Sequence, residues 1–599
     1  MAFQKNTGIG YSNKTIVQML YNVLPVQFLI YLLGDILNSI NGIAISGTQP
    51  TEALSAMAVC SAVVPFRAVF TTTVATGMVI LCGHKVGSGN GKETRRVMTT
   101  ASFNAIIAGI ALTILVLILR VPIARFIGAN DEILDYTVDY LTGIAFGITP
   151  MALITVLIDI VQMSGKLSNA IKFGLVQIVL TITAVFLTAY VFKGSLLQIS
   201  LASTVATLIT AIVIYIYIRV KSLGGTRLIK ELHLPYIGKI ILLGFPASLV
   251  SLMTGLRDVF ITNRIVSLGG AEAAAAMGVL ITIWFFIDGI VYGSGWAIAK
   301  ITSVSYGERD SDSIQNIFKE SMKHCSIITI IVGALYFVLA GIIAPLLSSD
   351  PAVIDIAVKL IRIFIVSRLA VMWVIVFISI FQSCKKPLAV FAFNGFAFLI
   401  FPVAGILLLE NSMGIDAVWW SYTIGPVAML VFWSIICIVR NQRFPKTMED
   451  LLLLNDFSNR IRKNWLLTSK KQAVIVSEEM MNFLRENGAS PRDSFICALC
   501  LEETVINIYD NAFECKDDEV WVFGAEEQCV DIQLCIDERH IIMRFRDNAK
   551  GFDLSSQASV YNAAPEDIIK NVGFRIISKY AKEMTYNRIY NMNILRIEI

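Results

Sequence analysis

Long apolar stretches follow one another through the first 440 residues of the chain, separated by short polar breaks. Each stretch is about 20 residues or longer, which is enough for a helix to cross the roughly 30 Å hydrocarbon layer of a membrane. A single large soluble core is excluded, because helices of this composition have no polar face to turn to water. The pattern predicts twelve transmembrane helices, near 17–45, 53–81, 98–120, 134–160, 170–192, 195–218, 236–262, 274–300, 323–347, 356–383, 388–409 and 416–439.

The pattern changes near residue 440, where charged residues become frequent and the apolar runs become short. Residues 1–440 hold 29 basic and 20 acidic side chains, a net charge of +9. Residues 441–599 hold 20 basic and 25 acidic side chains, a net charge of −5, and their pattern is typical of a soluble α/β domain. One polypeptide is thus predicted to serve two solvents, lipid and water.

Lysine and arginine gather in alternate loops of the apolar part, those after its second, fourth, sixth, eighth and tenth helices. Loops 47–52, 348–355 and 410–416 contain neither residue. Because basic loops stay on the cytoplasmic side, both termini are expected there, in a multi-pass protein of the plasma membrane. The polar segment 1–14 lacks the pattern of a cleavable signal, so the first apolar run is expected to be retained.

The apolar part repeats itself with an offset of 220 residues. The segment 51–57, TEALSAM, aligns with 271–277, AEAAAAM, and the same offset places Gly87 on Gly307. Each repeat has six predicted helices, an even number, so both repeats begin on the same side of the membrane and are parallel. Paired bundles of this kind hold a binding site between them, near the middle of the membrane, and rock around it.

Together these features resemble the multidrug and toxic compound extrusion (MATE) transporters. The resemblance covers about residues 15–440 and rests on the repeated segments and on the glycine-rich loops after the second and eighth helices. The segment 120–131, which begins Arg-Val-Pro and ends Gly-Ala-Asn-Asp, is also similar to that family. The resemblance implies a secondary antiporter that exports organic or xenobiotic solutes in exchange for Na⁺ or H⁺.

Polar residues deep in the apolar runs are candidates for ion or substrate binding, because such groups are costly in lipid. The candidates are Asp35, Asn38, Asp258 and Asp288. A buried carboxylate either takes up a proton or binds a cation, which suits ion coupling. At the 220 offset Asp258 falls on Asn38, and Asp35 lies one turn before Asn38 on the same helix face.

Structural ion pairing is the alternative for several of these positions. Arg257 adjoins Asp258, and a salt bridge between them would explain both residues without a ligand. Asp159 and Arg368 also lie deep in apolar runs, and pairing explains each of them at least as well as ligand binding does.

The soluble part divides into short elements. Helical spacing predicts helices at 473–487, 493–513 and 573–582, and short apolar runs predict strands at 520–523, 530–536, 540–545 and 594–599. The fold class predicted for the whole chain is an all-α polytopic membrane domain of two parallel six-helix repeats, followed by a cytosolic α/β sandwich. The predicted domains are an N-lobe at 1–220, a C-lobe at 221–440, a connector at 441–470 and the soluble domain at 471–599.

Two motifs in the soluble part suggest nucleotide chemistry. Glu503, Asn507 and Asn511 stand at i, i+4 and i+8 on one helix face. A carboxylate and an amide one turn apart can position a water and hold Mg²⁺, whose ligands are oxygens. Asp547 follows a strand and can accept a hydrogen bond from an adenine amino group, and Gly551 permits a close backbone approach.

A third motif, Asn571-Val-Gly573, begins a predicted helix whose N-terminal amides can hold phosphate. In this order the motifs resemble the ATP-binding domain of histidine kinases and, more closely, of the anti-sigma-factor serine kinases; Asn593 also fits. The resemblance implies that Glu503 polarises an attacking hydroxyl or water, that Asn507 binds Mg²⁺ and that Asp547 reads adenine. The nucleotide-binding set is Asn507, Asn511, Asp547, Gly551 and Gly573.

The chain departs from that family at Ala549, which replaces a glycine, and in a lid reduced to Gly573. Two functions are therefore weighed: an antiporter whose tail binds ATP and regulates transport, and a membrane sensor with a serine-kinase output on a cytosolic protein. Primary ATP-driven pumping is disfavoured, because no Gly-x4-Gly-Lys loop is present. The expected partners are the lipid bilayer, a small organic solute and a cytosolic protein, and not nucleic acid.

Overall fold

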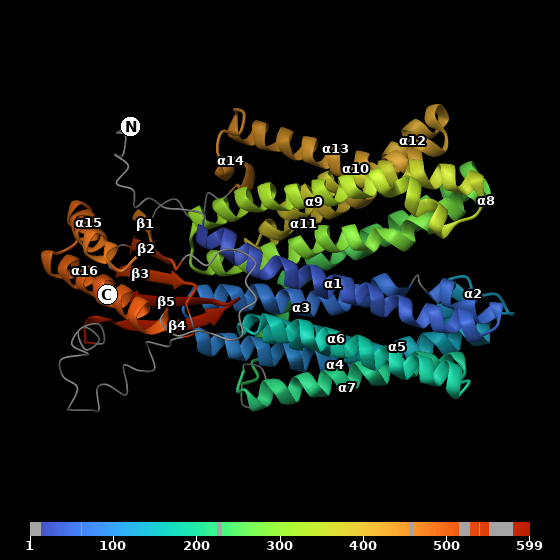
Figure 1. The fold of residues 1–599 in the computed structure, drawn as a ribbon, viewed down its shortest axis with the longest axis horizontal. Coiled ribbons are helices and arrows are strands. Elements are labelled where there is room, and N and C mark those ends of the chain that lie inside the picture. The colour runs from blue at the N-terminus through green and yellow to red at the C-terminus, as the bar shows by residue number, and fades with distance from the viewer. Residues whose placement is uncertain are drawn as a thin grey trace.

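The chain forms a long helical bundle with a small α/β domain at one end, as Figure 1 shows. We call that end of the bundle the sheet end and the opposite end the far end. The computed structural model describes residues 14–60, 63–223, 231–453, 461–513, 528–537, 540–549, 551 and 579–599.

Helices of the first repeat form the N-lobe. They are α1 (Lys14–Thr48), α2 (Thr51–Cys60), α3 (Val64–Gly87), α4 (Gly91–Phe126), α5 (Leu134–Met163), α6 (Leu167–Phe186), which continues as a π-helical turn (Leu187–Val191), and α7 (Leu196–Val220). The predicted second run, 53–81, is thus two elements, the short helix α2 and the longer α3.

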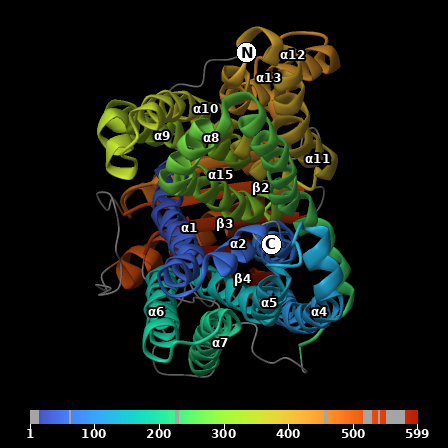
Figure 2. The ribbon, with the colours of Figure 1, turned by 90° about the vertical axis from the view of Figure 1, so that its right-hand side faces the viewer.

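Helices of the second repeat form the C-lobe. They are α8 (Pro235–Gly307), α9 (Ser311–Leu347), α10 (Pro351–Ser383), α11 (Pro387–Gly395), a π-helical turn (Phe396–Ile400), α12 (Phe401–Met413) and α13 (Ile415–Asn441). Figure 2, viewed from the far end, shows the two lobes as separate groups of helices.

Helix α8 is two transmembrane segments in one. It is 73 residues long, and its backbone leaves the helical region at Gly270, where φ is 65° and ψ is −159°. In the described residues eleven helices are long and apolar enough to cross a membrane, α8 counted once. With α8 divided at Gly270, these spans correspond to the twelve predicted apolar segments.

The lobes touch closely along α3 and α8. A Cβ atom at Gly77 on α3 would collide with the backbone of Ile240, and one at Gly244 on α8 would collide with the backbone of Thr73. Glycine is needed at both positions because the two helix backbones approach without room for a side chain.

The α/β domain follows α13 and is the tail of the chain. Its elements are α14 (Met448–Leu452), β1 (Ile461–Leu467), α15 (Gln472–Glu486), α16 (Pro491–Asn507), a π-helical turn (Ile508–Ala512), β2 (Val530–Asp537), β3 (His540–Asp547), β4 (Glu583–Ile589) and β5 (Met592–Glu598). The strands form one antiparallel sheet in the order β1-β2-β3-β5-β4.

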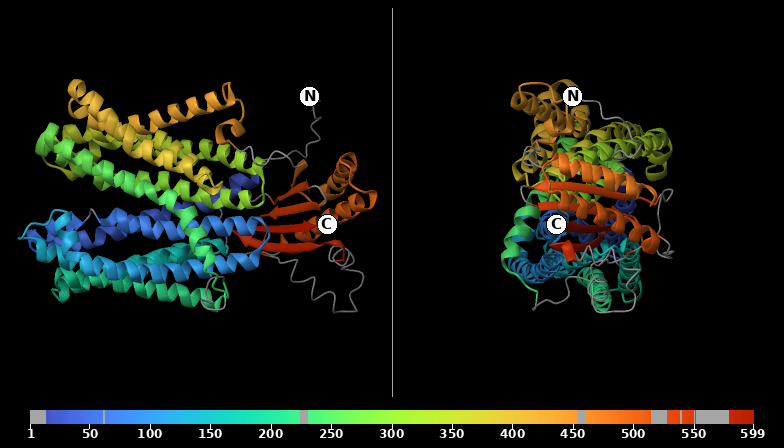
Figure 3. Two further views of the ribbon diagram at one scale, coloured as in Figure 1. Left: turned by 180° about the vertical axis from the view of Figure 1, so that it is seen from behind. Right: turned by 90° about the vertical axis from the view of Figure 1, so that its left-hand side faces the viewer.

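The two faces of this sheet meet different surroundings, as Figure 3 shows. Strand residues alternate between faces. On β3, Met543 and Phe545 join Val505 and other residues of α15 and α16 in one apolar core. The intervening residues Arg544 and Arg546 face the bundle and are also buried. The polar face of the sheet is therefore an interface and not a solvent surface.

The predicted tail elements 473–487, 493–513, 530–536, 540–545 and 594–599 agree with the described ones. Strands β1 and β4 were not predicted, and β1 lies inside the segment 441–470 predicted as a connector. Both strands carry polar side chains on the face that meets the bundle, which hides the usual apolar alternation. The predicted strand 520–523 and most of the predicted helix 573–582 lie outside the described residues.

Candidate functional site

Aromatic residues of the two lobes meet midway along the bundle. The rings of Tyr31 on α1 and Tyr292 on α8 stack with centroids 6.0 Å apart. The ring of Phe28 packs edge-on against Phe286 on α8, with centroids 5.2 Å apart. Because α1 belongs to the N-lobe and this part of α8 to the C-lobe, relative movement of the lobes would change these contacts.

Two of the predicted acids here are neutralised by arginines. Asp288 accepts a hydrogen bond of 2.6 Å from Nη1 of the buried Arg368. Asp258 accepts hydrogen bonds of 3.0 Å from Nε and 2.8 Å from Nη2 of Arg257, whose guanidinium lies 4.8 Å from the Tyr422 ring centroid. The predicted salt bridge between Arg257 and Asp258 is present.

Asp35 has a different environment. It lies half-buried on α1, and its carboxylate interacts electrostatically with that of Asp288 across the lobe interface. No base forms an ion pair with Asp35 among the described residues, and the structure does not describe the side chain of Asn38. Asp35 is therefore the acid of this group best suited to take up a proton or a small cation.

A buried network nearer the sheet end also joins the lobes. Nζ of Lys300 on α8 donates to Oδ1 of Asp159 at 2.8 Å and to Oε1 of Gln162 at 2.6 Å, both on α5. Gln27 on α1 donates to the same Gln162 oxygen. The Lys300 side chain is fully buried. Lys300 was not singled out from the sequence, because it ends an apolar run, where a lysine usually reaches towards the membrane surface.

The first nucleotide motif lies at the end of α16. Nδ2 of Asn507 donates to the backbone oxygen of Glu503 at 2.8 Å. Asn511 falls in the π-helical turn that follows, and its side chain is not described. In the described part of the chain, no three histidine, cysteine or acidic side chains form a metal-binding group. A Mg²⁺ ion would therefore depend on Glu503, Asn507 and the phosphates of a nucleotide.

The second motif lies at the end of β3. Oδ1 of the buried Asp547 accepts hydrogen bonds from the Ala549 amide at 2.9 Å and from Nδ2 of Asn593 at 2.7 Å. Among the described residues no donor reaches Oδ2, which leaves an acceptor for an adenine amino group. Tyr509, from the turn after α16, lies near Asp547.

Burial raises the pKa of Asp547 to about 6, although the hydrogen bonds from Asn593 and Ala549 oppose the shift. Burial, and next the neighbouring charge of Glu502, also raise the pKa of Glu503. Raised carboxyl pKa values are frequent at functional sites. Gly551 packs against the side chain of Arg588. Gly573, the last predicted nucleotide residue, lies outside the described residues.

Comparison with protein families identifies the bundle. The MatE family model matches residues 26–187 and 246–407, together more than half of the chain. The two matched stretches begin 220 residues apart, which confirms the internal repeat. The tail lies outside both stretches.

Two curated proteins are similar at 20% identity. They are the probable multidrug resistance protein YoeA of Bacillus subtilis, matched over 50% of this chain and 66% of its own length, and the multidrug export protein MepA of Staphylococcus saprophyticus, matched over 47% and 63%. The match thus spans less than two thirds of either relative.

Solved structures share the fold of the bundle. A crystal structure of MATE in complex with MaL6 has a TM-score of 0.65 and 18% identity, and covers 71% of this chain and 99% of its own. An outward-facing multidrug resistance MATE family transporter of the MOP superfamily has a TM-score of 0.64 and 17% identity, and covers 72% and 99%. A MOP superfamily transporter from Pyrococcus furiosus has a TM-score of 0.65 and 17% identity, with the same coverage.

Proposed function

This chain belongs to the MatE family, and we propose that it is a secondary antiporter that exports small organic solutes in exchange for Na⁺ or H⁺. The observation that carries the proposal is the environment of Asp35, an acid without a basic partner among the described residues. It lies where α1 of the N-lobe faces Asp288 and Arg368 of the C-lobe. A proton or cation bound at Asp35 would change the charge of that surface. Binding of the ion would then favour one relative position of the two lobes over another.

The multidrug names of the similar proteins support organic solutes as the class of substrate. The lobe interface is chemically suited to them, because aromatic faces such as those of Tyr31 and Tyr292 attract organic cations and pack against apolar ones. Asp258 and Asp288 are proposed to shape this surface through their arginine partners and not to carry the coupling ion.

We propose further that the sheet end is cytoplasmic. Lys85, Lys166, Arg219, Arg309 and Lys385 all lie at ends of helices on that side of the bundle, next to the tail. Basic loops are retained in the cytoplasm. The tail would then be exposed to cellular ATP.

The tail is proposed to bind ATP and Mg²⁺ and to regulate transport. Asp547 would accept a hydrogen bond from adenine, and Glu503 and Asn507 would hold the metal-bound phosphates. The raised pKa values of Asp547 and Glu503 support a functional role for both acids. The polar sheet face is buried against the bundle, so the extensive protein partner of the tail is the bundle itself. This favours regulation within the chain over signalling to a separate protein.

The test is transport by the full-length protein in liposomes. An inward gradient of Na⁺ or of H⁺ should drive a fluorescent organic cation in the opposite direction, and an ionophore that dissipates the effective gradient should stop it. Transport that ignores both gradients would contradict the antiport proposal. ATP added on the tail side should change the rate without replacing the gradient.

A further inference from the structure

The two repeats present equivalent loops to one sheet. In the N-lobe the loop between α3 and α4 places Gly89 against Thr585 on β4 and Arg596 on β5. At the 220 offset, the loop between α8 and α9 places Glu308 and Asp310 against Arg544 on β3. Since hydrogen bonds join the strands into one sheet, this single unit bridges the sheet ends of both lobes.

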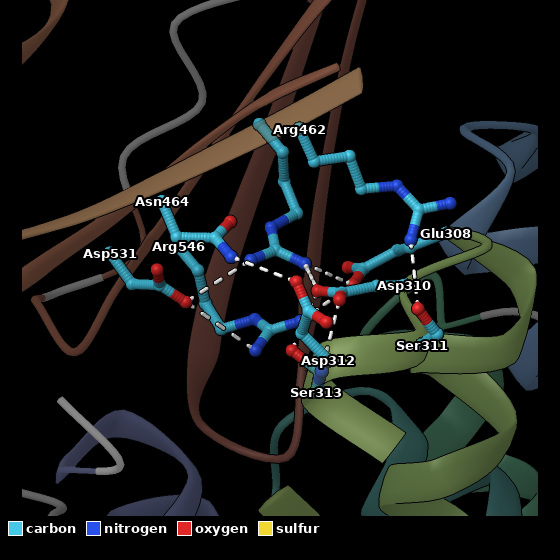
Figure 4. Close-up of polar contacts among 10 residues, drawn as sticks. Glu308, Asp310, Ser311, Asp312, Ser313, Arg462, Asn464, Asp531 and Arg546 are labelled. Carbon is cyan, nitrogen blue, oxygen red and sulfur yellow. Dashed lines mark hydrogen bonds and ion pairs between the residues drawn. The ribbon is translucent and has the colours of Figure 1, made fainter. Parts of the chain in front are cut away.

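The C-lobe contact is a buried ion cluster, shown in Figure 4, which we call the anchor. Oε2 of Glu308 accepts from Nη1 of Arg544 and from Nη2 of Arg546, each at 2.6 Å. Asp310 accepts from Nη1 of Arg544 at 2.7 Å, and Asp531 on β2 accepts from Nη2 of Arg544 at 3.2 Å. All five side chains are at most 5% exposed.

The anchor requires all of its members, because each buried charge is stabilised by the opposite charges beside it. Burial opposes the charge of Asp310, but Arg544 and the hydrogen bonds from Ser313 lower its pKa to about 2. Removing one member of such a buried group leaves an uncompensated charge, which is strongly destabilising. Flanking contacts extend it: Arg462 on β1 donates to Ser311 at 3.1 Å, and Asn464 donates to Asp312 at 3.4 Å.

The chain also ties the tail to the C-lobe next to the anchor. Nζ of Lys386, after α10, donates to the backbone oxygen of Leu452 on α14 at 3.0 Å. Gln315 on α9 donates to Glu449 at 3.1 Å, and Nε1 of Trp433 on α13 donates to Leu451 at 3.2 Å. The sheet is therefore fixed to the C-lobe by charge, by hydrogen bonds and by the covalent chain.

The N-lobe contact is of a different kind. The β4–β5 hairpin turns at Tyr590 and Asn591, whose φ angles are 51° and 62°. Ile589, Tyr590 and Met592 are almost fully buried and belong to the same apolar cluster as the bundle helices. Tyr590 lies near Asp159 on α5 and Cys82 on α3. The hairpin tip is thus inserted between N-lobe helices, beside the acid that pairs with Lys300.

The lobes meet at the sheet end in this conformation. Nε2 of His84 on α3 lies 2.7 Å from the Ser383 carbonyl oxygen on α10. A Cβ atom at Gly87 would collide with the backbone of Val304 and Gly307. Between these loops and the sheet lies a cavity of about 400 Å³ lined by Gly87, Arg309 and Arg544 among others.

We propose that the tail is a latch: the anchor keeps its sheet on the C-lobe, and the β4–β5 hairpin bolts that sheet to the N-lobe. Rocking of the lobes opens the sheet end only if the loops after α3 and α8 move apart. A rigid sheet held on both prevents this, so the hairpin must withdraw from between α3 and α5 before the sheet end opens. This proposal rests on the proposed function and specifies how the tail regulates it.

The first test reads conformation and does not require transport. Spin labels on Lys92→Cys and Lys319→Cys, two exposed positions on different lobes at the sheet end, report the distance between the lobes. The nine cysteines in the described residues are buried and should label poorly. Tyr590→Ala should raise the ratio of open to closed molecules about tenfold. Phe495→Ala, which truncates an aromatic that is 59% exposed on the same domain, should leave the distances unchanged.

The second test locks the latch. A Cβ atom at Gly91 on α4 would lie 3.2 Å from Oδ1 of Asn587 on β4, so Gly91→Cys with Asn587→Cys can be bridged by oxidation or a short bifunctional maleimide. The bridged protein should show only the closed distance between the lobes, even when it also carries Tyr590→Ala. Its transport rate should fall about tenfold, and the rate should recover when a disulfide bridge is reduced. Single-cysteine variants are the controls.

The outcomes separate the latch from the antiport proposal. Unchanged distances in Tyr590→Ala, or full transport by the bridged protein, would overturn the latch while leaving antiport standing. Distances that respond as expected in a protein that transports no solute under any gradient would support the latch and overturn antiport. For the anchor, Glu308→Arg should open the sheet end as Tyr590→Ala does, and adding Arg546→Glu should restore the closed distance; failure of that rescue would remove the anchor from the latch.

Discussion

The acids near the middle of the bundle differ in what neutralises them, and under the antiport proposal this difference singles out Asp35 as the carrier of the ion. Arg257 and Arg368 hold Asp258 and Asp288 as ion pairs, whereas no base pairs with Asp35 in the described residues. Asp35→Asn should therefore abolish gradient-driven transport, because the amide neither takes up a proton nor attracts a cation. Transport of a fluorescent organic cation into liposomes, measured at several pH values and Na⁺ concentrations, checks this.

The matched variants are Asp258→Asn and Asp355→Asn. Asp258→Asn leaves Arg257 without its partner and should alter the rate while preserving the response to the driving ion. Asp355 is an exposed acid on α10, and its replacement should have no effect. If Asp35→Asn retains full ion-dependent transport, the coupling site lies elsewhere.

Lys300 and Asp159 test how the lobes are held together near the sheet end. Lys300→Met should destabilise the protein by about 3–5 kcal/mol, because it leaves a buried carboxylate uncompensated. Adding Asp159→Leu should recover much of that loss, since the pair is then replaced by apolar groups of similar size. Thermal unfolding in detergent measures both. A loss in the double variant equal to the sum of the losses in Lys300→Met and Asp159→Leu alone would show that the pair is not coupled.

Residue chemistry was only partly predictable from the sequence. The pairing of Arg257 with Asp258 was, because the residues are neighbours in the chain. The partners of Asp288, Asp159 and the tail arginines come from helices or loops 80 to more than 230 residues away. No local spacing reports such pairs.

Among the helices, α8 depends on a single backbone position. Gly270 has φ 65° and ψ −159°, a conformation open essentially to glycine alone, and nothing lies within 4 Å of where its Cβ would be. Gly270→Ala should cost about 1–3 kcal/mol through backbone strain. Gly278, in the following helical arm, has equally open surroundings, so Gly278→Ala should be neutral or slightly stabilising. A lowered unfolding temperature in Gly278→Ala but not in Gly270→Ala would reverse this interpretation.

The elements show where sequence patterns succeed. The helices of the bundle follow from apolar length alone, and α15 and α16 from helical spacing, since each buries one face against a sheet. Strands β1 and β4 were not predicted, because their bundle-facing residues are polar, among them Arg462, Asn464 and Asn587. Sequence patterns interpret polar residues as facing water. They therefore do not reveal a polar strand face that packs against another part of the protein.

At the scale of the whole molecule, the repeat could be predicted from the sequence, whereas the docking of the tail on the bundle could not. An offset of 220 residues in the sequence predicted two lobes, and the family match has the same offset. The docking of the sheet depends on charges that are scattered over β2, β3 and one loop of the C-lobe. These residues form a cluster only after both domains have folded.

Strand β3 joins the two proposed roles of the tail, because Arg546 belongs to the anchor and the next residue, Asp547, belongs to the proposed nucleotide site. The Asp547 pKa of about 6 is above the ordinary value for an aspartate, so the carboxylate is charged above pH 6 and neutral below it. Only the charged form accepts strongly from adenine. Affinity of the full-length protein for a fluorescent ATP analogue should therefore fall about fourfold between pH 7.5 and pH 5.5.

Asp547→Asn should bind the analogue weakly at both pH values and lose the fourfold change expected from Asp547, because no group then titrates at that position. Glu486→Gln, at the end of α15 and exposed, is the control and should keep both the affinity and its pH profile. If nucleotide binding moves the hairpin, the analogue should also change the distance between labels at Lys92→Cys and Lys319→Cys in the parent protein and not in Asp547→Asn. A distance change that persists in Asp547→Asn would show that the bundle senses the nucleotide without β3.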